Sequence, residues 1–348
     1  MKRIRVLIVD DSATIRQLLA QILSRDPEIE VIGGAPEPAV ARQMIKELNP
    51  DVITLDVEMP NMNGLEFLEK IMRLRPMPVV MVSTLTAEGT EVTLDALALG
   101  AVDFFAKPTH NVGSTLDAAA DELTAKIKAA ASARLRSPTR KTPAAPQSDE
   151  KPFEDRLIAI GSSTGGVEAL LEVLSHFPAN CPPTVITQHM PAGFTTSFAA
   201  RLDKMCRPHV HEASEGATLQ AGQILLAPGA VAHLVVAGRA SWRCHLVADA
   251  PTSGHRPSVD RLFHSVAKAA GPKAIGAILT GMGRDGAEGL LAMRRSGAQT
   301  IGQDEATSIV YGMPRAAFES GAVERQLPLE KIGSEIISLA RHTAAGVT

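Results

Sequence analysis

Short apolar runs alternate with longer amphipathic segments along most of the chain. Parallel strands need long crossover connections, usually helices, so this alternation predicts βα units and largely parallel sheets. In the first half, the predicted strands cover residues 6–9, 31–32, 52–55, 79–82 and 103–106. Five strands with four or five helices predict an α/β, doubly wound domain of the flavodoxin-like type.

The second half shows the same alternation, with predicted strands at residues 157–160, 184–187, 223–227, 274–279 and 299–303. Residues 233–247 (HLVVAGRASWRCHLV) have the pattern of a β-hairpin turning on Gly238 and Arg239. We therefore expect a second doubly wound α/β domain with a mostly parallel sheet and a β-hairpin addition.

Residues 134–152 interrupt the two halves with four prolines, several charges and no apolar periodicity. Such a composition cannot bury enough surface to order itself, so it predicts an exposed linker. The Ala-rich, helical-looking residues 114–135 lead into it. We expect a first domain over residues 1–125, a helical extension and flexible linker over 126–152, and a second domain over 153–348.

Composition and charge exclude several classes of protein. The formal net charge of -3 argues against a nucleic-acid binder that works by bulk electrostatics. No segment approaches the roughly 18 consecutive apolar residues of a membrane-spanning helix. The apolar run near the start is too short for a signal peptide. The scattered cysteines form no metal-type pair and favour a reducing compartment. The expected location is the cytoplasm, with no membrane insertion and no nucleic-acid partner.

Charged side chains follow three predicted strands of the first half. Asp10 and Asp11 close the first strand, while Asp56 closes the third and Lys107 follows the fifth. In a doubly wound sheet the carboxyl ends of the strands are where ligands bind. Carboxylates crowded there repel one another, and a hard cation such as Mg²⁺ relieves the repulsion. Each acid alone is equally well explained as a solvated loop residue, but the set favours phosphoryl transfer to a carboxylate.

The segments VLIVDDS, LDVEMPNMNGLEFL, VVMVST and FFAKP resemble those of response-regulator receiver domains, over about residues 4–122. The resemblance implies that Asp56 is the phosphoacceptor and that Asp10 and Asp11, with Asp56, bind Mg²⁺. It also implies a histidine kinase as the phosphoryl donor.

A hydroxyl also follows the fourth predicted strand. The resemblance implies that Ser83 and Lys107 contact the phosphoryl group. The segment STLTAEGTE that begins there is slightly longer than the corresponding segment of most receivers. The hydroxyl that contacts the phosphoryl group could therefore belong to Ser83 or to the next residue, Thr84.

The second half opens with a strand, a glycine-rich turn and a helix. Residues 161–165 (GSSTG) match the pattern of glycine, any residue, serine, any residue, glycine of a nucleophile elbow. Position within the pattern favours Ser163 over Ser162 as the nucleophile. A glycine-rich turn that opens a helix also cradles phosphate, although this one lacks the P-loop ending and the dinucleotide-binding spacing. The turn alone does not decide between a serine nucleophile and a phosphate-binding loop.

A serine nucleophile needs a base and an orienting acid, and two later strand ends offer them. His189 follows the strand at residues 184–187, and Asp285 lies in the glycine-rich loop GMGRDG. With Ser163 they would form a triad on one rim, with oxyanion donors from the backbone of Thr164 and Met282. The order serine, histidine, aspartate disfavours the α/β-hydrolase fold family, whose order is serine, acid, histidine. The rival interpretation is a non-catalytic output module whose serine loop holds phosphate.

The segments IAIGSSTGG, ITQHMPAGFT, APG, HRPSVDRLFHSVA, ILTGMGRDGAEG and YGMPRAA resemble the catalytic domain of chemotaxis protein-glutamate methylesterases, over about residues 153–342. The resemblance implies that Ser163 is the nucleophile, His189 the general base and Asp285 its orienting partner. It implies no cofactor for this domain. The implied substrates are methyl-accepting chemoreceptors, whose glutamate methyl esters are hydrolysed and whose glutamines are deamidated.

The same resemblance implies that the receiver represses the esterase until Asp56 is phosphorylated. The sequence alone permits activation by dimerisation equally well. Near the expected cleft, His255 and Arg256 either line the substrate site or cap the helix that begins near Pro257.

Overall fold

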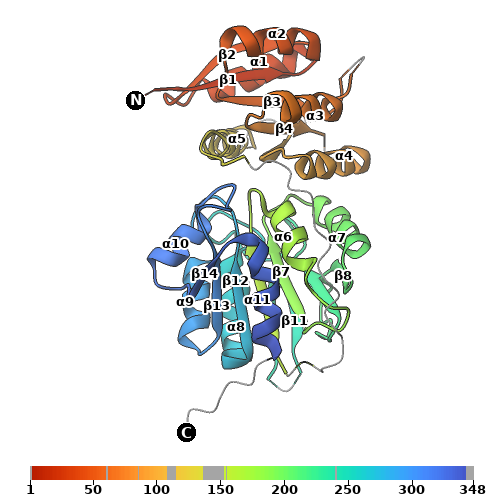
Figure 1. The fold of residues 1–348 in the computed structure, drawn as a ribbon, viewed down its shortest axis with the longest axis vertical. Coiled ribbons are helices and arrows are strands. Elements are labelled where there is room, and N and C mark those ends of the chain that lie inside the picture. Colours follow the sequence, from red (N-terminus) through yellow and green to blue (C-terminus); the bar gives the residue numbers. More distant parts are fainter. Residues whose placement is uncertain are drawn as a thin grey trace. The chain divides into compact units, whose positions relative to one another are not determined.

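The structure is a computed structural model that describes residues 2–59, 62–84, 86–107, 115–135, 153, 155–239 and 241–341. The chain divides into two compact units, Met1–Thr139 and Arg140–Thr348. Figure 1 shows the first unit in red to yellow and the second in green to blue. Most of the predicted linker over residues 134–152 lies outside the described residues.

The first unit has a five-stranded sheet in the order β2-β1-β3-β4-β5, and every strand pair in it is parallel. This is the predicted flavodoxin-like order. The strands are β1 (Ile4–Val9), β2 (Ile29–Ala35), β3 (Val52–Asp56), β4 (Val79–Ser83) and β5 (Asp103–Ala106). The helices are α1 (Ala13–Leu23), α2 (Pro38–Leu48), α3 (Gly64–Leu74), α4 (Ala87–Ala98) and α5 (Thr115–Ala131).

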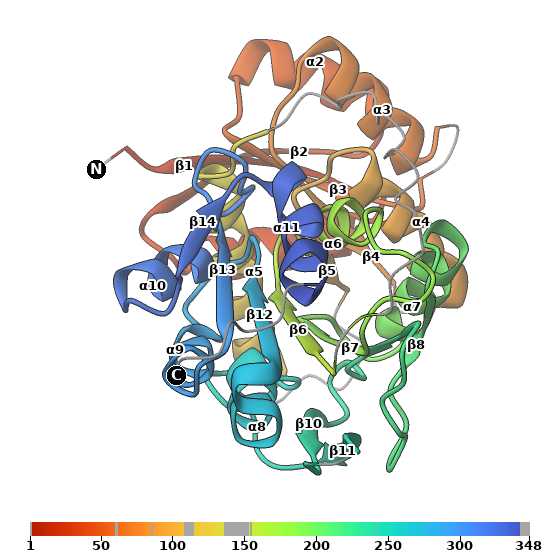
Figure 2. The same ribbon diagram turned by 60° about the horizontal axis from the view of Figure 1, so that its bottom comes forward.

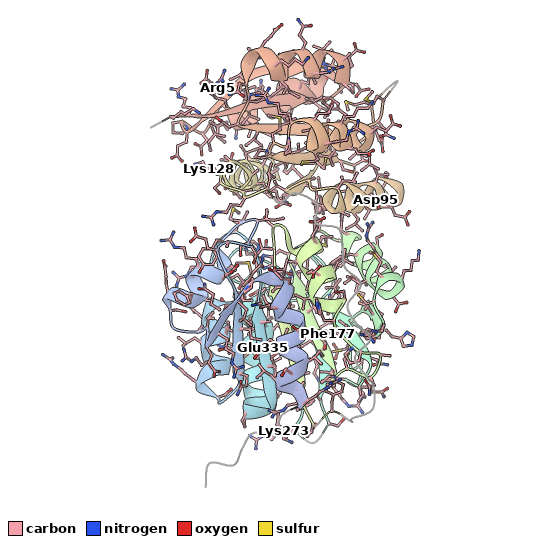
Figure 3. All side chains as sticks on the ribbon, in the orientation of Figure 1. Arg5, Asp95, Lys128, Phe177, Lys273 and Glu335 are labelled. Atoms are coloured by element: carbon pink, nitrogen blue, oxygen red, sulfur yellow. The ribbon has the colours of Figure 1, made fainter. Side chains whose placement is uncertain are left out.

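Helix α5 extends past residue 125, where the first domain was predicted to end. Its Ile127 and Ala130 are fully buried, and the helix packs against α1 and β5. Lys128, labelled in Figure 3, pairs with Asp26 at 2.8 Å and also with Glu28 in the turn before β2. The helix is therefore packed as part of the first unit to its end.

The second unit has a seven-stranded sheet in the order β14-β13-β12-β6-β7-β9-β8, with parallel pairing throughout. Its strands are β6 (Leu157–Ser162), β7 (Thr184–Gln188), β8 (His209–Glu212), β9 (Gln223–Leu226), β12 (Ala274–Ile278), β13 (Gln299–Gln303) and β14 (Arg325–Leu327). Its helices are α6 (Gly166–Leu174), α7 (Phe194–Met205), α8 (Val259–Ala270), α9 (Ala287–Arg295), α10 (Met313–Glu319) and α11 (Leu329–Arg341), with a 3₁₀ turn at Gly271–Lys273.

The predicted hairpin is confirmed as strands β10 (His233–Ala237) and β11 (Arg243–Val247), which pair antiparallel. They form a separate two-stranded sheet, and Figure 2 shows them beside α8. Elsewhere, α6 packs against α11 and α8 packs against α9. Among the described helices, none is long and apolar enough to cross a membrane.

Strand β6 occupies the position that matters most for the site. It lies between β7 and β12, and all six of its residues are buried. Because the three strands are parallel, their carboxyl ends open on the same edge of the sheet. The segments that follow them therefore meet there.

Candidate active site

Ser163 directly follows β6, and hydrogen bonds hold the residues around it. Its backbone N–H donates to the carbonyl of Thr280 at 3.0 Å, and its carbonyl accepts from Gln188 Nε2 at 2.9 Å. The neighbouring Ser162 is fully buried, and its hydroxyl donates to Gln188 Oε1 at 2.6 Å. Ser162 is thus engaged in the scaffold, whereas Ser163 is half-buried.

The glycine-rich turn differs from the nucleophile elbow that its letters matched. Its left-handed residue is Gly165, at φ 77°, which is the N-cap of α6. Ser163 does not appear among the described non-glycine residues with positive φ. A side chain at Gly165 would also collide with Ile309. The glycine thus serves the start of the helix and not a strained serine.

His189 follows β7, and its backbone N–H donates to the carbonyl of Ser162 at 3.1 Å. The imidazole Nε2 lies 2.9 Å from Asp285 Oδ2. The buried Nδ1 has no hydrogen-bond partner among the described residues. A neutral ring that donates from Nε2 carries its lone pair on Nδ1, which leaves Nδ1 to accept a proton.

The ring of His255 stacks on that of His189, with centroids 3.8 Å apart and planes 9° from parallel. Of the two alternatives for this residue, the structure supports contact with the site. The N-cap of α8 is Ser258, whose hydroxyl accepts from the N–H of Arg261. The capping alternative for His255 and Arg256 is therefore wrong.

Asp285 is buried against the N-terminus of α8. Its Oδ1 accepts from the hydroxyl of Ser258 at 2.8 Å and the N–H of Asp260 at 3.1 Å, while Oδ2 accepts from the N–H of Val259 at 2.7 Å. Burial alone would raise the pKa of Asp285, but the hydrogen bond and charge of His189, with these amides, lower that pKa to about 2. The carboxylate is charged and fixed.

Asp260 is a second carboxylate beside Asp285 that sequence reasoning missed. Its Oδ1 accepts from the N–H of Gly289 in α9 at 2.7 Å. Asp260 thus caps α9, whereas Asp285, which precedes α9, caps α8. Burial raises the pKa of Asp260 to about 6 against the Gly289 hydrogen bond, and repulsion from Asp285 adds to the rise. These reciprocal hydrogen bonds fix the loop that carries Asp285 against α8.

Gly281 lets the loop after β12 approach the serine closely. A Cβ at this position would lie 2.8 Å from the Cβ of Ser163 and 2.4 Å from the sulfur of Met313. Met282, one of the two predicted oxyanion donors, is the next residue in the chain. Thr164 is buried, and its carbonyl accepts from the hydroxyl of Thr280 at 3.0 Å. The roles of the Thr164 and Met282 backbone N–H groups as oxyanion donors stay predictions.

In the first unit, Lys107 forms ion pairs with two of the predicted acids. Its Nζ lies 3.0 Å from Asp10 Oδ2 and 2.8 Å from Asp56 Oδ2. Asp10, Asp11 and Asp56 each offer a carboxylate oxygen, and these oxygens lie within 4.8 Å of one another. Three hard oxygen ligands this close fit a magnesium ion.

The hydroxyl of Ser83 points to backbone carbonyls in this structure. It is buried at the last position of β4 and donates to Thr84 at 3.1 Å and Gly89 at 3.3 Å. Thr84 Oγ1 lies 3.5 Å from a carboxylate oxygen of Glu58. Either hydroxyl would have to turn to contact a phosphoryl group, so the choice between them stays open.

Adding Mg²⁺ to the full chain at neutral pH is expected to raise the unfolding temperature of the first unit. Burial raises the pKa of Asp56 from 3.8 to about 6 despite its pairing with Lys107. Because the folded state holds this proton more tightly, stability falls as pH rises from about 4 to 6. A cation among the carboxylates offsets that loss, and a gain of about 4 °C or more follows. Calorimetry with and without Mg²⁺ measures it.

The matched variant is Asp56→Asn, which keeps the shape and removes the buried charge. It should unfold at a higher temperature than the wild type without Mg²⁺ and respond less when Mg²⁺ is added. Equal responses of the two proteins would show that the cation does not bind at Asp56.

Two family models match the chain. The model described as CheB methylesterase matches residues 158–336, and the response regulator receiver domain model matches residues 6–116. The first match contains Ser163, His189 and Asp285, and the second contains Asp56 and Lys107.

Curated relatives match nearly the whole chain. A protein-glutamate methylesterase/protein-glutamine glutaminase from Caulobacter vibrioides is 62% identical over 342 residues, covering 98% of this chain and 99% of the relative. One from Agrobacterium fabrum is 58% identical and covers 96% of both. Among solved structures, the CheB methylesterase catalytic domain of Thermotoga maritima is 36% identical with a TM-score of 0.52, covering 53% of this chain and 99% of that domain.

Proposed function

This chain belongs to the CheB methylesterase family, and because it also carries a receiver domain, we propose that it is a phosphorylation-controlled esterase with a Ser163–His189–Asp285 triad. Its proposed substrates are methyl-esterified glutamates and glutamines of proteins, as the names of its relatives suggest. The resemblance to chemotaxis methylesterases implies that these proteins are chemoreceptors. The observation that carries the proposal is the 2.9 Å hydrogen bond between His189 and Asp285, formed at the rim where Ser163 follows β6.

In the first half-reaction, Ser163 Oγ attacks the ester carbonyl while Nδ1 of His189 takes the hydroxyl proton. The oxyanion that forms accepts hydrogen bonds from the backbone N–H groups of Thr164 and Met282. Each such donor contributes roughly 2.7 to 4 kcal/mol to the transition state. His189 then protonates the departing methoxide, and methanol leaves.

In the second half-reaction, water attacks the glutamyl ester on Ser163, and His189 takes one of its protons. Collapse of the intermediate returns that proton to Ser163 Oγ and releases the glutamate carboxylate. With a glutamine substrate the leaving group is ammonia, and the remaining steps are the same. Asp285 keeps the imidazole oriented and stabilises its cationic form throughout.

The receiver chemistry uses groups that converge at the carboxyl ends of the strands in the sheet of the first unit. Asp56 would accept the phosphoryl group from a histidine kinase, and Lys107 would neutralise part of its charge. Asp10, Asp11 and Asp56 would hold Mg²⁺, which when bound supplies positive charge to the transferring phosphoryl oxygens. In this proposal either Ser83 or Thr84 donates a hydrogen bond to the phosphorylated Asp56.

A fluorophosphonate probe tests the hydrolase proposal against the phosphate-binding rival. The probe should label the wild-type chain on the peptide that contains Ser163 and should fail to label Ser163→Ala. Ser162→Ala should still be labelled, because that hydroxyl points to Gln188. A wild-type chain that resists the probe, although folded, would favour the binding module.

Deleting residues 1–150 is expected to raise esterase activity, because the proposed receiver represses the catalytic domain until Asp56 is phosphorylated. Couplings of this kind are typically about 5- to 150-fold. Methanol release by the truncated and full chains, at equal concentration, measures the change. A truncated chain that folds but has lost its activity would support a receiver-dependent active form instead.

A further inference from the structure

Arg256 is a fixed cation beside the proposed triad. Its Nε donates to the carbonyl of Ala230 at 3.2 Å, and one terminal nitrogen donates to the carbonyl of Asp249 at 3.2 Å. Its own carbonyl accepts from the N–H of Ala230 at 3.0 Å. These bonds hold the guanidinium of the half-buried Arg256 in one position.

The charge of Arg256 has no carboxylate partner within the part of the chain that the structure describes. Arg261, one turn into α8, differs because its guanidinium pairs with the carboxylate of Asp249. Asp249 therefore gives Arg256 only a neutral carbonyl oxygen. A guanidinium carries five donors, and the two carbonyls use two of them. The remaining donors are available to an anion.

Two routes place Arg256 next to His189. It directly follows His255, whose ring stacks on His189 at 3.8 Å. It also holds Ala230, and the preceding Gly229 packs against the two residues that follow His189. A Cβ at Gly229 would lie within 2.6 Å of the carbonyl oxygens of both. The rim here is open, since the adjacent Val231 is 59% exposed.

An anion-binding group beside a site that hydrolyses glutamyl esters would bind the carboxylate of a neighbouring glutamate. This step rests on the proposed function, in which the substrate glutamate lies on a chemoreceptor helix. Residues one turn apart on a helix have Cβ atoms about 5–6 Å apart on the same face. A free glutamate at that spacing would accompany the ester into the site, and a guanidinium is well matched to a carboxylate.

We propose that Arg256 forms a carboxylate subsite that binds a free glutamate one helical turn from the methyl ester being hydrolysed. Esters next to a free carboxylate are then hydrolysed faster than esters next to an amide or another ester. On a helix with paired sites, removal of the first methyl group accelerates removal of the second.

Two helical peptides test the subsite with the full chain, phosphorylated on Asp56 so that the proposed repression is relieved. Each carries one glutamyl methyl ester, and the residue four positions away is Glu in one peptide and Met, a neutral side chain of similar length that cannot be deamidated, in the other. The wild type is expected to show a kcat/KM about 10-fold higher for the Glu peptide, because the ion pair between its carboxylate and Arg256 forms when the substrate binds and therefore lowers KM. The preference should fall as salt is added, since the site is partly exposed.

The variants Arg256→Gln and Lys268→Gln separate the subsite from general surface charge. Arg256→Gln should reduce the ratio of the two kcat/KM values to about one, while Lys268→Gln, which removes a positive charge from the exposed face of α8 and leaves the Arg261–Asp249 pair intact, should keep it. Equal rates on the two peptides for the wild type, or an unchanged preference in Arg256→Gln, would overturn the subsite while leaving the esterase intact. Failure of the wild type to hydrolyse either peptide would instead overturn the proposed function on which the subsite rests.

Discussion

Replacing Ser163 with alanine is expected to lower kcat for a glutamyl methyl ester by about 10⁴-fold or more. Without the hydroxyl no acyl-enzyme can form, and His189 has no serine to deprotonate. Neighbouring oxyanion donors would still bind the ester, so a small residual rate and a nearly unchanged KM are expected. Methanol release over time measures kcat, and an unchanged unfolding temperature would show that the variant is folded.

The matched control is Ser162→Ala, which removes the adjacent hydroxyl. Ser162 holds Gln188 and through it the carbonyl of Ser163, so its loss should reduce kcat by about 10-fold or less. If Ser163→Ala retained full methanol release, or if Ser162→Ala lost more activity, the nucleophile would be wrongly assigned.

Asp285→Asn is expected to lower kcat by about 10⁴-fold, because an amide cannot hold the imidazole of His189 in the required tautomer or stabilise its charge. A second effect falls on stability. Asp285 accepts three hydrogen bonds from Ser258, Val259 and Asp260 at the start of α8. An asparagine can accept only with its one oxygen, so the variant should also unfold more easily.

The stability effect of Asp285 has a defined pH window. The folded state lowers the pKa of Asp285 from 3.8 to about 2. A lowered carboxyl pKa stabilises the fold above about 4, and this contribution is lost as pH falls towards 2. The difference corresponds to about 2 kcal/mol at neutral pH. The free energies of unfolding of wild type and Asp285→Asn should converge in acid, and a gap that widened there would contradict this account.

The central strands could be predicted because both of their faces are buried. β1, β3, β4, β6 and β12 appear in the sequence as mostly apolar runs, broken only by Arg5, by Thr54 and by a polar last residue in β3, β4 and β6, as a doubly covered parallel strand requires. The short edge strands β8 and β14 were missed. Half or more of their residues are partly or fully exposed, so they leave no apolar run to detect.

The site residues that follow the ends of predicted strands could be predicted from the sequence. His189 and Asp285 follow β7 and β12, the two strands that flank β6, and the rule that parallel strands open on one edge brought them together with Ser163. The role of Asp260 was not foreseen, because it depends on how α8 packs against a loop about 25 residues further along. The stacking of His255 was not foreseen either, because its partner His189 follows β7, much earlier in the chain. The serine in PSVD before an amphipathic helix is a capping signal that could have located Ser258.

Methanol release from a methylated chemoreceptor of the same genome tests the central claim most directly. The purified chain, phosphorylated on Asp56, should release one methanol for each methyl group lost from the receptor, and Ser163→Ala should release none above background. A chain that reacts with a fluorophosphonate at Ser163 but releases no methanol from the receptor would contradict the claim, because its nucleophile would then serve another ester.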